Sequence, residues 1–423
     1  MKKEKKYFHA IKIVEENCTG CTRCVRVCPT EALRVRNEVV ILDDSRCIDC
    51  GRCVAACPYD AIQTFADNLS IIEQKKYKVA IVSTAYAGQF PENIGYKTAL
   101  KALLHIGFDE VAEESMVTEI MGKMIREYLR KNPQTRPVLS SNCPSVVRLI
   151  QVRFPSLLSH IYLNEAPMSV LAMYLRKKIA VEKKISENDI GIYLIVPCVA
   201  QVTAVHQPEG TYRHLQDGAI PIRDVYQKVM SKMEEIAKDK NDIKVYPKGL
   251  SWALSGMEAE EINDGTIKTL AVSGIDNVIK ILAKLENGQL EKYDFIVLNS
   301  CENGCVGGVL NIEHPSIAAS RIRRILRTEK SDKVDDKFFM EMYRKGNFKV
   351  SPLEPRPIMQ LADDIKVALE KMSKIREITE QLPGLDCSAC GSPTCKALAE
   401  DIVAGKADIK DCVVLLKREK VKK

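Results

Sequence analysis

The chain has 423 residues, of which 46% are hydrophobic and 28% are charged, the composition of an ordinary globular protein. A net charge of +7 is small for this length, and no basic run is interleaved with aromatic residues, which argues against nucleic-acid binding. No stretch approaches the roughly 18 apolar residues that would predict a membrane-spanning helix. We therefore expect a cytoplasmic protein, in which the 16 cysteines predict metal ligation or catalysis and not disulfide bonds.

Residues 1–76 contain an internal repeat that is dense in cysteine. The first copy reads CTGCTRCVRVCPTEAL from Cys18, and the second reads CIDCGRCVAACPYDAI from Cys47. A short alternating run before each copy predicts a strand, and we expect a short helix after each Cys-Pro.

The repeated pattern C-x2-C-x2-C-x3-C-P is typical of bacterial ferredoxins with two clusters, where the fourth cysteine of each run binds the other cluster. It predicts an α+β ferredoxin domain over residues 1–76. Zinc is the disfavoured alternative, because four-cysteine zinc sites use two separated C-x2-C pairs. The predicted [4Fe–4S] ligands are Cys18, Cys21, Cys24 and Cys57 for the first cluster, and Cys28, Cys47, Cys50 and Cys53 for the second.

Residues 77–349 read as an α/β domain. The apolar runs KVAIVST, GIYLIVP, TLAVSG and DFIVLNS alternate with segments of helical period such as EIMGKMIREYLRK. This alternation predicts a largely parallel sheet covered by helices. Cys143, Cys198 and Cys301 follow the ends of predicted strands, where chemistry is expected in such sheets.

Residues 350–380 are predicted to form a proline-rich linker and a helix. The helix should run from about Met359 to Gln381. Its apolar residues fall on one face, which comprises Leu361, Ile365, Leu369, Met372 and Ile375.

The last segment, residues 381–423, has its cysteines spaced C-x2-C-x4-C-x16-C, at Cys387, Cys390, Cys395 and Cys412. The spacing alone leaves a zinc ribbon as an alternative. The flanking sequence LPGLDCSACGSPTC, followed by AEDIVAG, resembles the small [4Fe–4S] module of corrinoid iron–sulfur proteins and of the Rnf complex B subunit. The resemblance implies a small helical module with a low-potential cluster that relays single electrons.

The four remaining cysteines lie in segments that resemble the three signatures of [FeFe]-hydrogenases. SSNCPSVVRL is similar to the first signature, VPCVAQVTA to the second and SCENGCVGG to the third. The resemblance implies a hydrogenase-like α/β domain of two lobes over residues 77–349. It also implies that a [4Fe–4S] cube is held by Cys143, Cys198, Cys301 and Cys305, with Cys305 at the position that bridges to a two-iron unit in the family.

The residues that serve the two-iron unit in this family are replaced. Asn142 stands where the family has its proton-delivering cysteine, and Gln201 stands where a lysine binds a cyanide ligand. Ala204 replaces the glutamate of the second signature, and an ungapped reading places Tyr162 at the proton-relay serine. An amide cannot act as a general acid or base near neutral pH. Because most of these residues are lost together, we expect the two-iron unit to be absent, or bound without fast turnover.

We therefore predict an iron–sulfur electron-transfer protein or subunit, related to [FeFe]-hydrogenases, that carries four [4Fe–4S] clusters. We do not expect this chain alone to turn over hydrogen. Its partners would be an electron carrier such as ferredoxin, a companion hydrogenase or other redox subunits of an anaerobe. The alternatives are a regulatory protein that senses hydrogen or redox state, and a slow, diverged hydrogenase. For Cys143 and Cys198, buried structural thiols are a further alternative.

Overall fold

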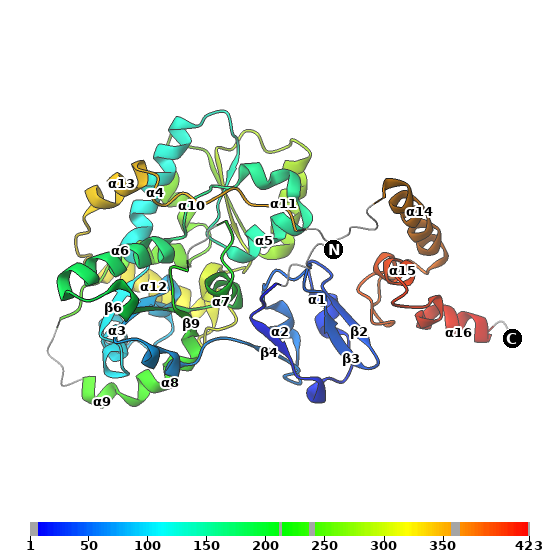
Figure 1. The fold of residues 1–423 in the computed structure, drawn as a ribbon, viewed down its shortest axis with the longest axis horizontal. Coiled ribbons are helices and arrows are strands. Elements are labelled where there is room, and N and C mark those ends of the chain that lie inside the picture. Colours follow the sequence, from blue (N-terminus) through cyan, green and yellow to red (C-terminus); the bar gives the residue numbers. More distant parts are fainter. Residues whose placement is uncertain (1–6, 211–213, 237–241, 357–363, 422–423) are drawn as a thin grey trace. The chain divides into compact units, whose positions relative to one another are not determined.

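A computed structural model describes residues 7–210, 214–236, 242–356 and 364–421. The chain forms two compact units, one made of Met1–Phe65 with Pro355–Lys423 and the other of Ala66–Glu354. The first unit therefore joins the two ends of the sequence, and the second is the α/β part (Figure 1).

The N-terminal part of the first unit is built from two similar halves. Strand β1 (Ile11–Ile13) pairs antiparallel with β4 (Ile62–Thr64), and β2 (Leu33–Arg36) pairs antiparallel with β3 (Val39–Leu42). Each strand that precedes a cysteine run thus pairs with the strand that follows the other run. The side chains of Val25, Leu33, Val40 and Ile62 form the core between the halves.

The helices of this part lie before each Cys-Pro and not after it, so that prediction was wrong. Helix α1 (Arg23–Val27) ends at Cys28, and α2 (Arg52–Ala56) ends at Cys57. The three-residue gap between the third and fourth cysteines accommodates one helical turn, and the proline that follows cannot continue it. The residues after each proline form β2 and β4 instead, and Leu33 and Ile62 of these strands are buried.

The backbone repeats its unusual conformations along with its cysteines. Gly20, Thr22 and Glu31 have positive φ angles, and so do the residues 29 positions later, Asp49, Gly51 and Asp60. The cysteines of the two runs are offset by the same 29 positions. The two loops therefore have the same turn geometry, although glycine occupies a different left-handed position in each.

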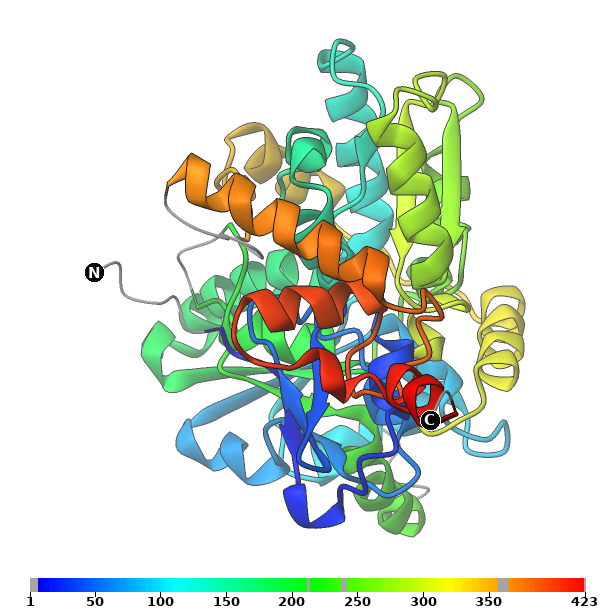
Figure 2. The ribbon, with the colours of Figure 1, turned by 90° about the vertical axis from the view of Figure 1, so that its right-hand side faces the viewer.

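The C-terminal part of the first unit is helical. Helix α14 (Ile365–Gln381) runs alongside α15 (Cys395–Val403), and α16 (Val413–Val421) follows (Figure 2). The predicted helix is thereby confirmed from Ile365 on, whereas Met359 and Leu361 lie outside the described residues. On its apolar face only Ile375 is buried, and Ile365, Leu369 and Met372 are exposed. The small core comprises Ile375, Leu382, Leu398, Ala399 and Cys412.

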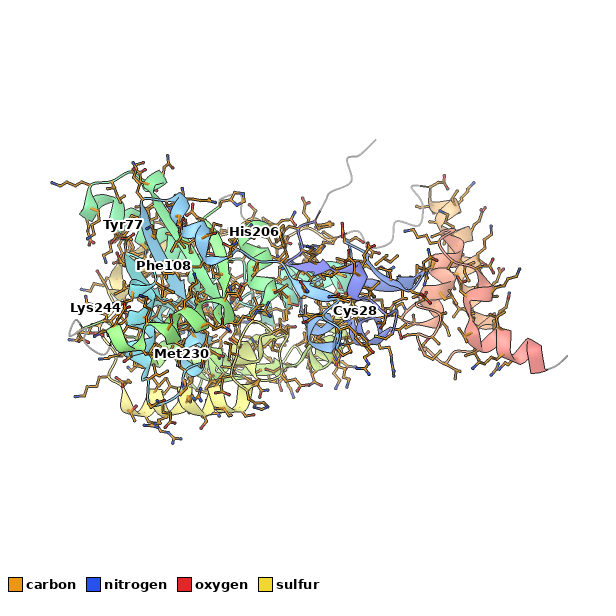
Figure 3. All side chains as sticks on the ribbon, turned by 90° about the horizontal axis from the view of Figure 1, so that it is seen from below. Cys28, Tyr77, Phe108, His206, Met230 and Lys244 are labelled. Carbon is orange, nitrogen blue, oxygen red and sulfur yellow. The ribbon has the colours of Figure 1, made fainter. Side chains whose placement is uncertain are left out.

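The second unit contains a four-stranded parallel sheet in the order β6-β5-β8-β9. Its strands are β5 (Tyr77–Val82), β6 (Glu110–Glu113), β8 (Ile190–Val196) and β9 (Gly218–Pro221). All seven residues of β8 are buried, as expected for a strand with both faces covered. The helices of this lobe include α3 (Tyr96–His105), α6 (Pro167–Lys183), α8 (Ile222–Ser231) and α12 (Pro315–Thr328). Phe108, labelled in Figure 3, packs with Tyr193 in its core.

A three-stranded parallel sheet in the order β10-β11-β7 forms the second lobe of this unit. The strands are β7 (Val138–Leu139), β10 (Thr269–Ser273) and β11 (Phe295–Asn299), and helices α10 (Met257–Ile262) and α11 (Ile275–Glu286) pack on them. Helix α4 (Ser115–Lys131) packs against both α6 and α10. Two further helices are α9 (Met233–Ile236) and α13 (Asp336–Arg344). The predicted alternation of strands and helices with parallel pairing is confirmed.

Within the described part of the chain, no helix combines the length and hydrophobicity of a membrane-spanning segment.

Candidate iron–sulfur sites

The ferredoxin-like part of the first unit brings its eight cysteines together in two groups. One cavity is lined by Cys18, Cys21, Cys24 and Cys57. A second cavity is lined by Cys28, Cys47, Cys50 and Cys53. The fourth cysteine of each run crosses to the other group because α1 and α2, which end at these cysteines, pack against each other.

The sulfur atoms of these groups are crowded, and all of the cysteines except the exposed Cys21 are buried or partly buried. Burial, together with the charge of neighbouring cysteines, raises the pKa of the Cys24 thiol to about 11 and that of Cys50 to about 12. Backbone amides nevertheless point at the sulfurs, with Ala32 N at 3.2 Å from Cys28 Sγ and Ala61 N at 3.3 Å from Cys57 Sγ. Thiolates packed this closely require a bound cation, and an iron cluster ligated by four thiolates suits this donor set.

A buried histidine–carboxylate pair lies beside the second group. His9 Nδ1 is 2.9 Å from Asp49 Oδ2, and Ala10 N donates to the other oxygen of Asp49 at 3.1 Å. The ligating atoms of His9, Cys47 and Asp49 all lie within 4.8 Å of one another. The spacing of the cysteines could not reveal this pair, because His9 comes from outside the repeat.

The C-terminal module assembles its four cysteines in the same manner. Cys387, Cys390, Cys395 and Cys412 line one cavity, as the cysteines of each ferredoxin group do. Cys395 begins helix α15, and its backbone N–H donates to Asp386 Oδ1 at 2.7 Å. The four sulfurs thus meet although the last lies 17 residues beyond the third.

The central site collects cysteines from three loops of the second unit. Cys143 precedes α5 (Pro144–Arg153), and Cys198 precedes α7 (Val199–His206). Cys301 and Cys305 follow β11, as expected from the strand ends. Burial, together with Glu114, Cys198, Cys143 and Cys301, raises the thiol pKa of Cys305 well above the ordinary value. The fold therefore brings all four central cysteines together.

Two helix N-termini point their amides at this site. The backbone N–H groups of Val146 and Ser145 bond to Cys143, and those of Gln201 and Ala200 bond to Cys198. Amides at a helix N-terminus stabilise negative charge, so both sulfurs are placed to act as thiolate ligands. Burial nevertheless affects the Cys198 thiol more than these amides do, and it raises the pKa of Cys198 to about 12.

Glycines allow the loop of the third signature to pack closely on its neighbours. A Cβ atom on Gly308 would lie 2.3 Å from Pro197 O and 3.2 Å from Cys198 Cβ. Gly304 has φ +76°, and a Cβ there would lie 2.6 Å from Ala253 O. Asn311 closes the loop, because its Nδ2 donates to the carbonyl oxygen of Cys305 at 2.9 Å.

The residue before Cys143 is engaged by a buried carboxylate. Asn142 Nδ2 donates a hydrogen bond of 2.8 Å to Glu258 Oε1. Burial raises the pKa of Glu258 to about 7, although the bond from Asn142 opposes this shift. Glu258 belongs to α10, and it could not be predicted from the sequence because no motif links α10 to the cysteine signatures.

A second buried carboxylate, Glu114, was also missed. Its Oε2 accepts a hydrogen bond of 3.0 Å from Thr84 N, and its charge acts on Cys305. Burial raises the pKa of Glu114 above its ordinary value. The groups that donate hydrogen bonds to Glu114 are Thr84 N and Ser83 Oγ, and Asn142 Nδ2 donates to Glu258, so both carboxylates are bound by neutral donors.

The other replaced positions lie around the same site. Gln201 is in α7, and its Oε1 is buried with no hydrogen-bond partner among the described residues. Ala204 and Tyr162 line a cavity of about 110 Å³ together with the fully buried Arg148. Arg148 Nε lies 3.5 Å from Glu209 Oε1.

Tyr162 is buried in an aromatic environment. Its ring packs edge-on against Tyr128, with 5.0 Å between the ring centroids. Burial raises the pKa of its hydroxyl well above the ordinary value. The hydroxyl therefore stays protonated across the physiological range.

Comparison with known proteins identifies the family. The family model "Iron only hydrogenase large subunit, C-terminal domain" matches residues 76–238 and 210–309, more than half of the chain. A model of 4Fe–4S dicluster domains matches residues 17–61, and an Fe–S cluster model matches residues 382–414. Among curated proteins no sequence matches the chain.

Solved structures agree with this result at the level of the fold. A variant of the apo [FeFe]-hydrogenase HydA1 from Chlamydomonas reinhardtii is 15% identical with a TM-score of 0.50, and the match covers 66% of this chain and 94% of that one. A second HydA1 variant from the same organism is 16% identical with a TM-score of 0.49 and the same coverage. The predicted fold class is thereby confirmed. The chain belongs to the iron-only hydrogenase large-subunit family, as a hydrogenase-like protein that also carries 4Fe–4S domains.

Proposed function

We propose that this protein transfers single electrons through four [4Fe–4S] clusters and does not turn over hydrogen. The ferredoxin-like part would hold two clusters, the central site one and the C-terminal module one, with the 16 cysteines as their ligands. When bound, each cluster would supply one-electron redox chemistry. The domains would be residues 1–76, 77–349 and 381–423, with residues 350–380 as linker and helix.

The contact between Asn142 and Glu258 carries this proposal. Asn142 occupies the position from which the family delivers protons, and its amide has no pKa in the useful range. Its Nδ2 is already committed to Glu258 at 2.8 Å. No proton can therefore be passed at this atom, and the arrangement supports a site that accepts and returns electrons only.

The other replacements point the same way. Gln201 is neutral, so it cannot make the charge-assisted hydrogen bond by which a lysine would bind an anionic ligand. Tyr162 is buried against Tyr128 and keeps its proton. These positions would no longer anchor a two-iron unit or move protons to it.

The partners we propose are one-electron carriers, such as a ferredoxin, or companion redox subunits that include a true hydrogenase. The exposed Cys21 and Cys387 support this proposal, because they bring two of the cluster sites close to the surface. We propose the cytoplasm of an anaerobe as the location, since low-potential clusters of this kind are lost in oxygen.

The test is a spectroscopic and analytical comparison of two proteins. The wild-type chain and an Asn142→Cys/Gln201→Lys variant are each produced anaerobically together with the maturation enzymes of [FeFe]-hydrogenases. We expect about 16 irons per wild-type chain, no infrared bands from carbonyl or cyanide ligands, and no hydrogen uptake.

The Asn142→Cys/Gln201→Lys variant shows whether the replaced residues explain an absence of infrared bands in the wild-type protein. If infrared bands appear only in the variant, the replaced residues explain the absence of the two-iron unit. Clear bands in the wild-type protein would overturn the proposal, and would favour a slow hydrogenase if hydrogen uptake accompanied them or a sensor if it did not.

A further inference from the structure

Within the first unit, strand β2 is joined to the C-terminal module by a cluster of ion pairs. Arg34 Nε and Arg36 Nη2 each donate to Asp401 Oδ2 at 2.7 Å. Ser392 Oγ donates to the same oxygen at 3.0 Å. One carboxylate oxygen of the module therefore receives three hydrogen bonds, two of them from the ferredoxin-like part.

These charges are largely withdrawn from solvent. The side chains of Arg34, Arg36 and Asp401 are 10%, 20% and 13% exposed. Exposed ion pairs contribute little to stability. A desolvated carboxylate that accepts several hydrogen bonds fixes the relative positions of the groups that it joins. A second pair, Arg46 with Glu400 at 3.2 Å, reinforces the same contact with side chains 11% and 9% exposed.

The backbones of the two parts meet beside these ion pairs. Val35 N donates to Gly391 O at 2.8 Å, which extends the outer edge of β2 by one hydrogen bond. Gly391 has φ +81°, and a Cβ atom there would lie 2.1 Å from Val35 O. Only glycine permits this approach, because any side chain would collide with the strand.

The contact lies between two of the cysteine sites. Val35 lines the cavity of Cys18, Cys21, Cys24 and Cys57. Gly391 directly follows Cys390, which lines the cavity of the module, and Arg36 Nη1 donates to Cys390 O at 3.2 Å and to Val35 O at 2.9 Å. Val35 of β2 thus lines one site and is hydrogen-bonded to Gly391, the residue next to Cys390 of the other site.

We propose that Asp401 is a positioning residue that docks the C-terminal module on β2, so that electrons pass directly between the Cys390 site and the Cys18–Cys57 site. This inference rests on the proposed electron-transfer function. The step moves one electron from a reduced cluster to an oxidised one, and no bond is made or broken and no proton is transferred. A one-electron carrier of low potential would supply the electron. Tunnelling weakens steeply with distance, so a module held by its linker alone would exchange electrons slowly.

The first test measures docking without reference to the clusters' activity. Hydrogen exchange followed by mass spectrometry is compared in the holoprotein for wild type, Asp401→Ala and Glu380→Gln. We expect the amide of Val35 to exchange at least about tenfold faster in Asp401→Ala, a factor that corresponds to about 1.4 kcal/mol. Glu380→Gln is the matched control, because it removes an exposed acidic group of α14 whose ion pair, among the described residues, is with Arg376 on the same helix.

The second test measures the coupling between the sites. In the fully reduced protein, two paramagnetic clusters that lie close together broaden each other's electron paramagnetic resonance signals. The signal of the module is identified by its loss in Cys412→Ala. We expect Asp401→Ala to remove the broadening while retaining iron, Arg36→Lys to retain part of it, and Glu380→Gln to resemble wild type.

The outcomes separate this inference from the proposed function. Unchanged exchange at Val35 in Asp401→Ala, or faster exchange with unchanged broadening, would overturn the inference and leave the electron-transfer function in place. A wild-type chain without iron in the module would overturn both. If Asp401→Ala loses the module's iron, Gly391→Ala provides a second disruption of the same contact, with the same two measurements.

Discussion

Replacing Asn142 by cysteine should destabilise the protein only at a pH where Glu258 is ionised. Asn142 donates the 2.8 Å hydrogen bond to this carboxylate, and a thiol is too weak a donor to replace it. The variant is the obvious first step in restoring hydrogenase chemistry. Its stability therefore bears directly on whether such a restoration can succeed.

The size and the sign of the effect follow from the pKa of Glu258. Burial raises this pKa from 4.5 to about 7, so the folded state holds the proton more tightly than the unfolded state. Glu258 thus contributes stability that is present below pH 4.5 and is lost as pH rises through about 7. The bond from Asn142 stabilises only the charged form, and a hydrogen bond to a charged group contributes roughly 1.5–3 kcal/mol. Asn142→Cys should cost about 2 kcal/mol above pH 8, and well under about 1 kcal/mol near pH 5.5.

Urea unfolding under anaerobic conditions measures this difference. Trp252 is the only tryptophan in the chain and lies in the second unit, so its fluorescence follows that unit alone. The control is the same replacement in a Glu258→Gln background, where the cost should not depend on pH. An equal loss of stability at both pH values in the Asn142→Cys protein would refute the reasoning.

Three further predictions concern single positions. Gly308→Ala places a Cβ 2.3 Å from Pro197 O. It should lower the iron content by about four per chain, lost from the central site, while the visible absorption of the ferredoxin clusters is retained. Burial raises the pKa of Glu113 from 4.5 to about 8, so its contribution to stability is lost as pH rises through that range. Glu113→Gln should therefore stabilise the protein above pH 8, by at most roughly 5 kcal/mol, and leave it unchanged below pH 5, as judged from urea midpoints. Cys412→Ala should lower the iron content by about four per chain without altering the ferredoxin signals, and a loss of all iron would contradict independent sites.

The elements of the fold were largely predictable because their signals are local. The run from Ile190 to Val196 is apolar throughout because both faces of the sheet are covered there, and such a run predicts a strand. The helix after each Cys-Pro was predicted wrongly, because helical turns were expected beyond prolines that in fact end them. The exposure of Ile365, Leu369 and Met372 could not be predicted either, since an apolar stripe does not specify what covers it.

The sequence by itself determined which cysteines form local sets and which residues of the hydrogenase signatures have been replaced. Both properties depend only on spacing and residue type along short segments. Tertiary structure alone decided what surrounds those sets. Glu258 reaches Asn142 from 116 positions away, and Asp401 reaches Arg34 from 367 positions away. Contacts between single charged or polar side chains leave no periodic pattern in a sequence, because only the packing of distant elements brings the two partners together.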